Sequence, residues 1–263
     1  MVLRNEQAPS RRERILLYGA PGTGKSWAWV SIAEWLEKTK SPGKVILHDT
    51  DIAWDAMRPV DGRLDDRVIP MSLWEWGDYK AAMSKAMTMA GSESKDDWLV
   101  VDLVDKAWDA AQEGFFERAY GAEIDEFYVN IAHNNAKSGP KNQLSAGGEY
   151  GANWNVIKKM YQSYITGLLR WPGHVLCCAA AAQVHTEGVM ADSDVTRREF
   201  GGFGWKPAGE KNLPHLFHTV LLCQRGRDNW TMSVAKDRNR EVKKGIEVDS
   251  FVTSYLFPNG WRP

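Results

Sequence analysis

Apolar residues gather in short, nearly continuous runs along the chain, and most of these runs end in a polar residue or a glycine. Four runs have the length and composition of buried strands, at 14–18, 44–51, 98–105 and 174–184. Strands that are apolar on both faces are typical of a parallel sheet that helices cover on each side. The pattern therefore predicts an α/β fold with a mainly parallel central sheet.

Segments with helical character separate these strands. We predict helices over residues 27–39, 71–90, 106–133 and 154–170, with Ser72 as a candidate N-cap of the second. Toward the C-terminus, residues 218–226 and 229–238 have the pattern of a β-hairpin, and residues 245–257 that of further extended structure. The expected architecture is a three-layer α/β/α domain with antiparallel strands at its C-terminal end.

Three stretches show neither the pattern of a strand nor that of a helix. Residues 53–70 contain two prolines and a glycine and are predicted to form a loop. Residues 133–153 and 185–212 are polar, contain glycine and are predicted to form long loops. Because long loops inside compact domains are usually functional or disordered, these two are candidates for a functional role.

The length of 263 residues suits one large domain, which we expect at 14–263 after a charged, flexible lead-in at 1–13. The formal net charge of -1 means that any nucleic-acid surface must be local. No apolar run is long enough to span a bilayer, and the N-terminus lacks a signal-peptide pattern. We therefore expect no membrane contact and a cytoplasmic location.

Cysteine and tryptophan usage points to the core. The three cysteines include an adjacent pair in an apolar run, which indicates reduced core thiols rather than a disulfide framework. Most of the 13 tryptophans are expected to pack in the core or in an interface.

The most specific pattern is GAPGTGKS at residues 19–26, directly after the first predicted strand. It fits G-x-x-x-x-G-K-[ST], in which glycines let backbone N–H groups surround a phosphate. Lys25 would reach the outer phosphates, Ser26 would hold Mg²⁺, and the next helix would add the positive end of its dipole. An ordinary Gly-Pro turn is the alternative. The candidate nucleotide contacts are Gly19, Pro21, Gly22, Thr23, Gly24, Lys25, Ser26 and Trp27.

Polar side chains also stand at the ends of the other strands, where α/β sheets bind their ligands. Asp102 is the candidate second anchor for Mg²⁺, and Asp105 is a weaker candidate in the same region. Asp49 and Asp51, two apart on an extended segment, should point to one side, where one of them would orient or deprotonate an attacking water. Gln183 would sense the terminal phosphate. Each has an alternative as an ordinary strand-end, turn or helix-capping residue.

This set of motifs resembles the RecA-type ATPase core, because its elements occur in the same order over about residues 14–250. The resemblance implies a RecA-like P-loop NTPase with Walker A and Walker B motifs that binds ATP and magnesium. Asp51 stands where the family has its catalytic glutamate, one methylene shorter, which predicts a different water position and slow turnover. Asp55 matches the family's adenine-contacting aspartate.

The same resemblance assigns roles to two further segments. Residues 185–212 correspond to the family's principal single-stranded-DNA-binding loop, and residues 134–153 to its other DNA loop. Cations and aromatic rings suited to single-strand binding occur in the first of these, at Arg197, Arg198, Phe203, Trp205 and Lys206. Phe203 and Trp205 have an alternative role, which is to pin the loop to the core or to a neighbouring subunit.

Basic residues on a late strand reach the neighbour's nucleotide in RecA-like rings and filaments. Lys236 and Arg238 are the candidates for that role, with a solvated basic hairpin as the alternative. The catalytic set that the resemblance implies is Asp51, Gln183, Lys25, Arg238 and Lys236.

The leading hypothesis is an ATP-hydrolysing RecA-like protein of the phage type that acts on single-stranded DNA in recombination, annealing or replication, as an oligomer. One alternative is an AAA+-type remodeller or helicase loader, which requires packed helices after residue 215. Another is a small-molecule P-loop kinase with Arg197 and Arg198 in its lid. A further alternative is a DNA-annealing module in which ATP only organises a ring.

Overall fold

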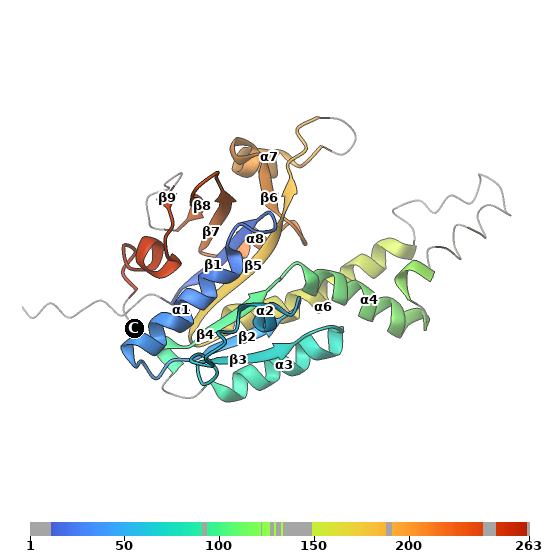
Figure 1. Cartoon of the computed structure of the whole chain (residues 1–263). Coiled ribbons are helices and arrows are strands. Elements are labelled where there is room, and N and C mark those ends of the chain that lie inside the picture. Colours follow the sequence, from blue (N-terminus) through green and yellow to red (C-terminus); the bar gives the residue numbers. More distant parts are fainter. Residues whose placement is uncertain are drawn as a thin grey trace, which may run out of the picture.

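The computed structural model describes residues 12–261, except 91–93, 122, 127–128, 130–132, 134–148, 188–190 and 239–245, and for residues 94 and 149–153 it describes the backbone alone. Figure 1 shows the chain. The strands are β1 (Arg14–Gly19), β2 (Val45–Asp49), β3 (Val68–Ser72), β4 (Trp98–Asp102), β5 (His174–Gln183), β6 (Trp205–Pro207), β7 (Thr219–Arg225), β8 (Trp230–Asp237) and β9 (Ile246–Glu247).

These strands form one sheet with the order β3-β2-β4-β5-β1-β7-β8-β9, and β6 pairs with the end of β5. Strands β1 to β5 and β7 run parallel, whereas β8 and β9 are antiparallel additions at one edge. The predicted parallel sheet with antiparallel C-terminal strands is confirmed. Parallel strands end at the same edge, so the residues after β1, β2, β4 and β5 gather along it.

The longer helices are α1 (Lys25–Thr39), α3 (Trp76–Met89), α4 (Lys106–Tyr120) and α6 (Glu149–Arg170), and the shorter ones are α2 (Ala53–Met57), α7 (Asp194–Phe200) and α8 (Leu213–Leu216). Strand side chains alternate between two apolar clusters. Leu16 and Tyr18 pack with α3, α4 and α6, while Ile15 and Leu17 pack with α1 and α2. The three-layer α/β/α arrangement is thus confirmed, with α1 over the face opposite α3 and α6 (Figure 1).

Several predicted boundaries are wrong. The stretch 53–70 is not only a loop, because it contains α2 and the first residues of β3. Ser72 ends β3 and caps no helix; instead Glu75 caps α3, and its side chain and that of Asp78 exchange hydrogen bonds with backbone N–H groups. Helix α6 begins at Glu149, inside the stretch predicted as a loop at 133–153, and the rest of the predicted DNA loop at 134–148 lies outside the described residues.

The C-terminal segment was also predicted wrongly as extended. Only β9 is a strand, and Val252–Leu256 forms a helical turn of the π type. Val252, Tyr255 and Leu256 are buried against the α1 side of the sheet. Their spacing is helical, which brings all three side chains to one face of the segment.

The cysteines are free and buried, which confirms the prediction of reduced core thiols. Six tryptophans are buried, at 29, 54, 76, 98, 171 and 261. Five are exposed, at 27, 74, 154, 205 and 230. Of these, Trp27 and Trp230 lie beside the loop that follows β1.

Candidate functional site

The loop from Gly19 to Gly24 joins β1 to α1 at the carboxyl edge of the sheet. Gly22 and Gly24 adopt left-handed backbone angles, with φ of 77° and 85°. A Cβ at Gly19 would lie 2.4 Å from the carbonyl oxygen of Cys223, so that position needs glycine for a different reason, namely close packing. The three glycines therefore set the path of this loop.

The N-terminus of α1 presents unopposed positive charge. No side chain caps the helix and no acidic residue occurs in its first turn, so its first N–H groups and the helix dipole are available to an anion. The Lys25 ammonium lies across the loop and donates to the carbonyl oxygens of Gly19 (2.8 Å) and Ala20 (3.0 Å). Backbone donors, dipole and lysine thus converge on one place, as phosphate binding requires.

Asp102 ends β4 and is fully buried. The indole nitrogen of Trp29, on α1, donates to its Oδ2 (2.9 Å), while Oδ1 has no hydrogen-bond partner among the described residues. Burial raises the pKa of Asp102, and the Trp29 indole, the Ser26 hydroxyl and the charge of Lys25 oppose that shift. A buried carboxylate oxygen without a partner, close to the Ser26 hydroxyl, fits a hard cation with oxygen ligands such as Mg²⁺.

Asp49 and Asp51 occupy different environments, and the expectation that they point to one side of an extended segment is wrong, because β2 ends at Asp49. The Asp49 carboxylate accepts the backbone N–H groups of Ala53 (2.8 Å) and Trp54 (3.0 Å), so it caps α2. Asp51 follows in a turn and is exposed. Partial desolvation, then the charges of Asp102 and Asp49, raise the pKa of Asp51 to about 6, and a hydrogen bond from the backbone of Ala53 and the charge of Lys25 oppose this shift.

The other predicted residues near this edge are more widely spread. Gln183 is the exposed last residue of β5 and pairs with Trp205 of β6. Asp55 is exposed on α2. Asp105 accepts the backbone N–H of Ala180 (3.0 Å), which ties the turn after β4 to β5.

The segment 185–212 contains α7, a short turn at 201–203 and β6, so the prediction of an unstructured loop is wrong for much of it. The paired strands β5 and β6 extend beyond the main sheet, and α7 lies near their far end (Figure 1). Ser193 caps α7 by accepting the backbone N–H of Thr196 at 3.3 Å. The predicted DNA contacts of this segment therefore sit on an ordered support.

Most of these predicted contacts have partners within the chain. Arg197 forms an ion pair with Asp194, and Lys206 forms one with Asp192. Phe203 packs partly against the core. Arg198 is exposed and forms no hydrogen bond or ion pair with another side chain among the described residues, and Trp205 is 41% exposed.

Lys236 and Arg238 lie at the end of β8, far along the sheet from Asp102 in strand order. The Lys236 ammonium donates to the carbonyl oxygens of Pro214 and His215, both at 3.0 Å, and Arg238 donates to that of His215 at 3.3 Å. Both cations thus bind the C-terminal end of α8 in their own chain, where a helix favours positive charge.

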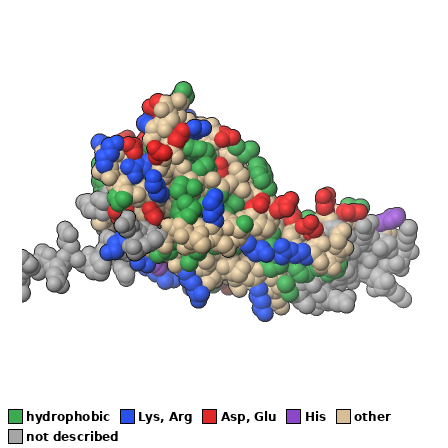
Figure 2. Space-filling view, turned by 90° about the horizontal axis from the view of Figure 1, so that it is seen from below, with side chains coloured by type: hydrophobic (Ala, Val, Ile, Leu, Met, Phe, Trp, Pro, Cys, Tyr) green, Lys and Arg blue, Asp and Glu red, His purple; other side chains and the backbone are tan. Residues whose placement is uncertain are grey.

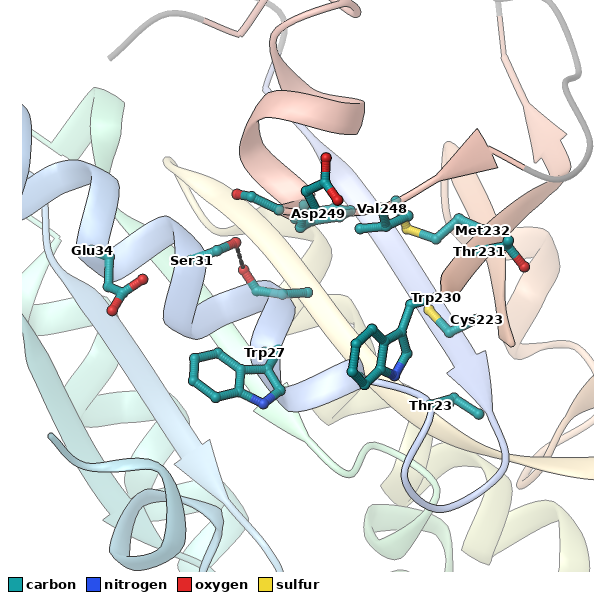
Figure 3. Close-up of a pocket in the computed structure, with 14 residues that line it drawn as sticks. Thr23, Trp27, Ser31, Glu34, Cys223, Trp230, Thr231, Met232, Val248 and Asp249 are labelled. Atoms are coloured by element: carbon teal, nitrogen blue, oxygen red, sulfur yellow. Dashed lines mark hydrogen bonds between the residues drawn. The ribbon is translucent and has the colours of Figure 1, made fainter. Parts of the chain in front are cut away.

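A pocket beside the loop from Gly19 to Gly24 is lined by residues that are far apart in the sequence and were not predicted to lie together. It has a volume of about 390 Å³ and is walled by Thr23 and Gly24 of the loop, Trp27 of α1, and Trp230 of β8 (Figure 3). The Trp230 indole nitrogen donates to the Gly22 carbonyl oxygen (3.5 Å). Trp27 was predicted from its place after Ser26, but no local pattern could assign Trp230, which lies about 200 residues away in sequence.

On the face shown in Figure 2, basic and acidic side chains are interspersed. No helix in the described part of the chain has the length and apolar character needed to cross a bilayer. The described residues also hold no group of three or more His, Cys, Asp or Glu placed to cage a metal. A magnesium ion bound with a nucleotide needs no such cage, since phosphates and waters supply most of its ligands.

The chain is an α/β domain with a glycine-rich loop between β1 and α1, at the carboxyl edge of its sheet. No protein-family model matches the chain, and no curated protein matches its sequence. Among solved structures it is similar to the crystal structure of the RadB recombinase, at 10% identity and a TM-score of 0.44, over 90% of this chain and 86% of that one.

Proposed function

We propose that this chain is a magnesium-dependent P-loop ATPase of RecA-like type that acts on single-stranded DNA as an oligomer. One observation carries the ATPase part of the proposal, namely the convergence of the uncapped α1 N-terminus, Lys25 and the buried Asp102 carboxylate at one edge of the sheet. The helix N-terminus and Lys25 favour the negatively charged phosphate, and the Asp102 carboxylate favours Mg²⁺. A Gly-Pro turn alone requires none of the three.

The residues of the loop hold the phosphates. The backbone N–H groups of α1 bind the oxygens, and the Lys25 ammonium exchanges its two carbonyl partners for the outer phosphates. Mg²⁺, when bound, neutralises charge that develops on the transferring phosphoryl group. Ser26 and the free Oδ1 of Asp102 are the groups that would hold it.

Asp51 is the group that would accept a proton from the attacking water. Asp49 is engaged in capping α2 through two backbone N–H groups, whereas Asp51 is exposed and interacts with the backbone of Ala53 alone in that helix. Its pKa of about 6 places it near the working pH of a cytoplasmic enzyme, which suits a general base. Gln183, at the end of β5, would report the state of the phosphate to β6, with which β5 pairs, and through β6 to α7.

The DNA part of the proposal draws on the segment from 185 to 212. Arg198 and Trp205 supply an exposed cation and an exposed ring, the two kinds of group that bind a single strand. Because Arg197 and Lys206 are paired with acids, they would have to exchange those partners for phosphates. The trans role of Lys236 and Arg238 likewise requires release of the α8 carbonyls when a second copy binds.

Two alternatives make different demands on the chain. After Leu216, the described residues form three strands and one five-residue helical segment, and the packed helices that a AAA+ remodeller requires are not found among them. A kinase would use Arg197 and Arg198 as a lid over a small phosphate acceptor. Nothing specific in the site favours either alternative.

ATP hydrolysis measured with and without a single-stranded oligonucleotide, at low and moderate salt, tests the proposal. Stimulation that weakens with salt is expected, because phosphate contacts release counterions. Steady turnover that the oligonucleotide does not change would remove DNA from the proposal, and phosphate transfer to a nucleoside or sugar would replace it with a kinase.

A further inference from the structure

The pocket beside the phosphate loop is formed by two parts of the chain that are distant in sequence. Trp27, Ala28 and Ser31 come from α1, whereas Trp230, Met232 and Phe251 come from β8 and the C-terminal segment. Its volume of about 390 Å³ falls within the range of sites for small organic ligands, roughly 300 to 1,000 Å³. The pocket opens directly onto Thr23 and Gly24, so a group bound there is continuous with one on the loop.

Both tryptophans are unusually exposed for their size. Trp27 is 59% exposed and Trp230 is 42% exposed, although indole rings are generally well buried. Figure 3 shows both rings at the same side of the pocket, Trp230 close to the loop and Trp27 on α1. Exposed indoles beside an anion-binding loop offer flat surfaces on which a heteroaromatic ring can stack.

The Trp230 ring is held in place before any ligand binds. Its nitrogen donates to the Gly22 carbonyl oxygen (3.5 Å), and the Arg225 guanidinium lies 5.3 Å from the ring centroid. A Cβ on Gly24 would lie 3.5 Å from Trp230 Cδ1, so the ring is in van der Waals reach of the loop. A preorganised ring loses little freedom on binding, which favours affinity.

Several polar groups of the pocket are left free to accept hydrogen bonds. The Thr23 and Ser31 hydroxyls already donate to backbone carbonyls, at 2.8 Å each. Glu34 is paired with Arg63 (2.9 Å), whereas the Asp249 carboxylate has no ion-pair partner among the described residues. No lysine, arginine or histidine lines the pocket. A carboxylate that only accepts suits a ring that carries an amino group.

We propose that the base of the bound nucleotide is an amino-purine that lies in this pocket, against Trp27 and Trp230, with its amino group toward Asp249. The inference rests on the proposed nucleotide-binding function and deepens it. It also differs from the sequence-based expectation for Asp55, because Asp55 lines neither this pocket nor the second one that borders Trp27 on its α2 side.

Calorimetric titration of the full chain with ATP, ITP and inorganic tripolyphosphate separates the two proposals. Stacking on an aromatic ring is worth about tenfold or more in affinity per base. We expect Trp230→Ala and Trp27→Ala each to weaken ATP by about that factor and to leave tripolyphosphate unchanged. Trp230→Phe should retain most of the affinity. Trp74→Ala is the matched control, since Trp74 is also 59% exposed but does not line the pocket.

ATP affinity that neither substitution changes, with tripolyphosphate still bound, would overturn the base pocket and leave the phosphate site intact. An equal loss of affinity for ATP and for tripolyphosphate would also overturn the base pocket, because the tryptophans would then act through the phosphate site. ITP lacks the amino group, so we expect it to bind several-fold more weakly than ATP; equal affinities would contradict the role of Asp249. If the unaltered chain binds neither ATP nor tripolyphosphate, the proposed function itself fails.

Discussion

Asp49 and Asp51 lie two residues apart, yet the first carboxylate caps α2 through the N–H groups of Ala53 and Trp54 while the second is exposed and partly desolvated. The two acids are therefore separable by experiment, although their sequence context is nearly the same. Asp49 thus has a structural task, and Asp51 is the one to which the proposed function gives a chemical role.

Substitution of these acids should affect stability in opposite directions. Asp49→Ala removes two hydrogen bonds to the start of α2, and such caps contribute about 1 kcal/mol. We therefore expect a lower free energy of unfolding, measured by urea denaturation. Asp51→Asn removes a charge that the folded state disfavours, so we expect a higher melting temperature at pH 8.

The gain from Asp51→Asn should depend on pH. The pKa of Asp51 is about 6 in the folded chain and 3.8 as the ordinary value, so the folded state binds this proton more tightly. The stability that proton binding provides is complete below about pH 4 and lost as the pH rises through 6. The variant should thus match the parent chain near pH 4 and exceed it at pH 8, and a gain equal at both values would contradict the assigned pKa.

Turnover should follow the same ionisation. If Asp51 accepts the proton of the attacking water, kcat/KM for ATP should rise with pH through an apparent pKa of about 6, which is that of the free enzyme. Asp51→Asn should lower kcat by about a hundredfold or more, since general bases contribute that much. If Asp51→Asn keeps both the parent kcat and the fall of kcat/KM at low pH, Asp51 is excluded as the base.

Asp102→Asn tests the magnesium site. Asparagine keeps an acceptor for the Trp29 indole but removes the charge, so the fold should remain and its stability without ligand should not fall. We expect the ATP affinity to fall about tenfold when Mg²⁺ is present. When EDTA has removed Mg²⁺, the ATP affinity should change little. Equal affinities of variant and parent chain in Mg²⁺ would place the ion elsewhere.

Arg198→Ala tests the DNA surface. Because Arg198 is exposed and unpaired among the described residues, its loss should weaken oligonucleotide binding and reduce the salt slope by about 0.7. Lys206→Ala is the matched comparison and should have a smaller effect, since Lys206 is paired with Asp192. A larger effect of Lys206→Ala would show that this ion pair opens on the strand.

The sequence predicted the centre of this fold better than its edges. Buried strands such as β4 and β5 are continuously apolar, and the loop at 19–26 has a fixed spacing, so local patterns suffice for both. Strand β3 was missed because Pro70 lies within it, which is tolerated since β3 is an edge strand. Helix α7 was missed because it is short and polar, although Ser193 was a capping signal.

The parts of the site that escaped prediction depend on elements and contacts that form only in the folded chain. The capping role of Asp49 was a stated alternative, but only the position of α2 selects it. The approach of Trp230 to Gly22 joins two segments that share no local pattern, and only the strand order β1-β7-β8 brings them together. Ion pairs of Arg197 and Lys206 likewise follow from the fold of 185–212 rather than from its composition.

The most direct test of the central claim is Mg²⁺-dependent ATP hydrolysis by the purified chain, measured beside Lys25→Ala. Among the described residues, the hydrogen bonds of the Lys25 ammonium go to carbonyl oxygens of its own loop, so the variant should fold as the parent chain does, which circular dichroism and thermal unfolding without nucleotide will check. The account predicts turnover that requires Mg²⁺ and is lost in Lys25→Ala. Turnover that persists unchanged in a well-folded Lys25→Ala variant would contradict it.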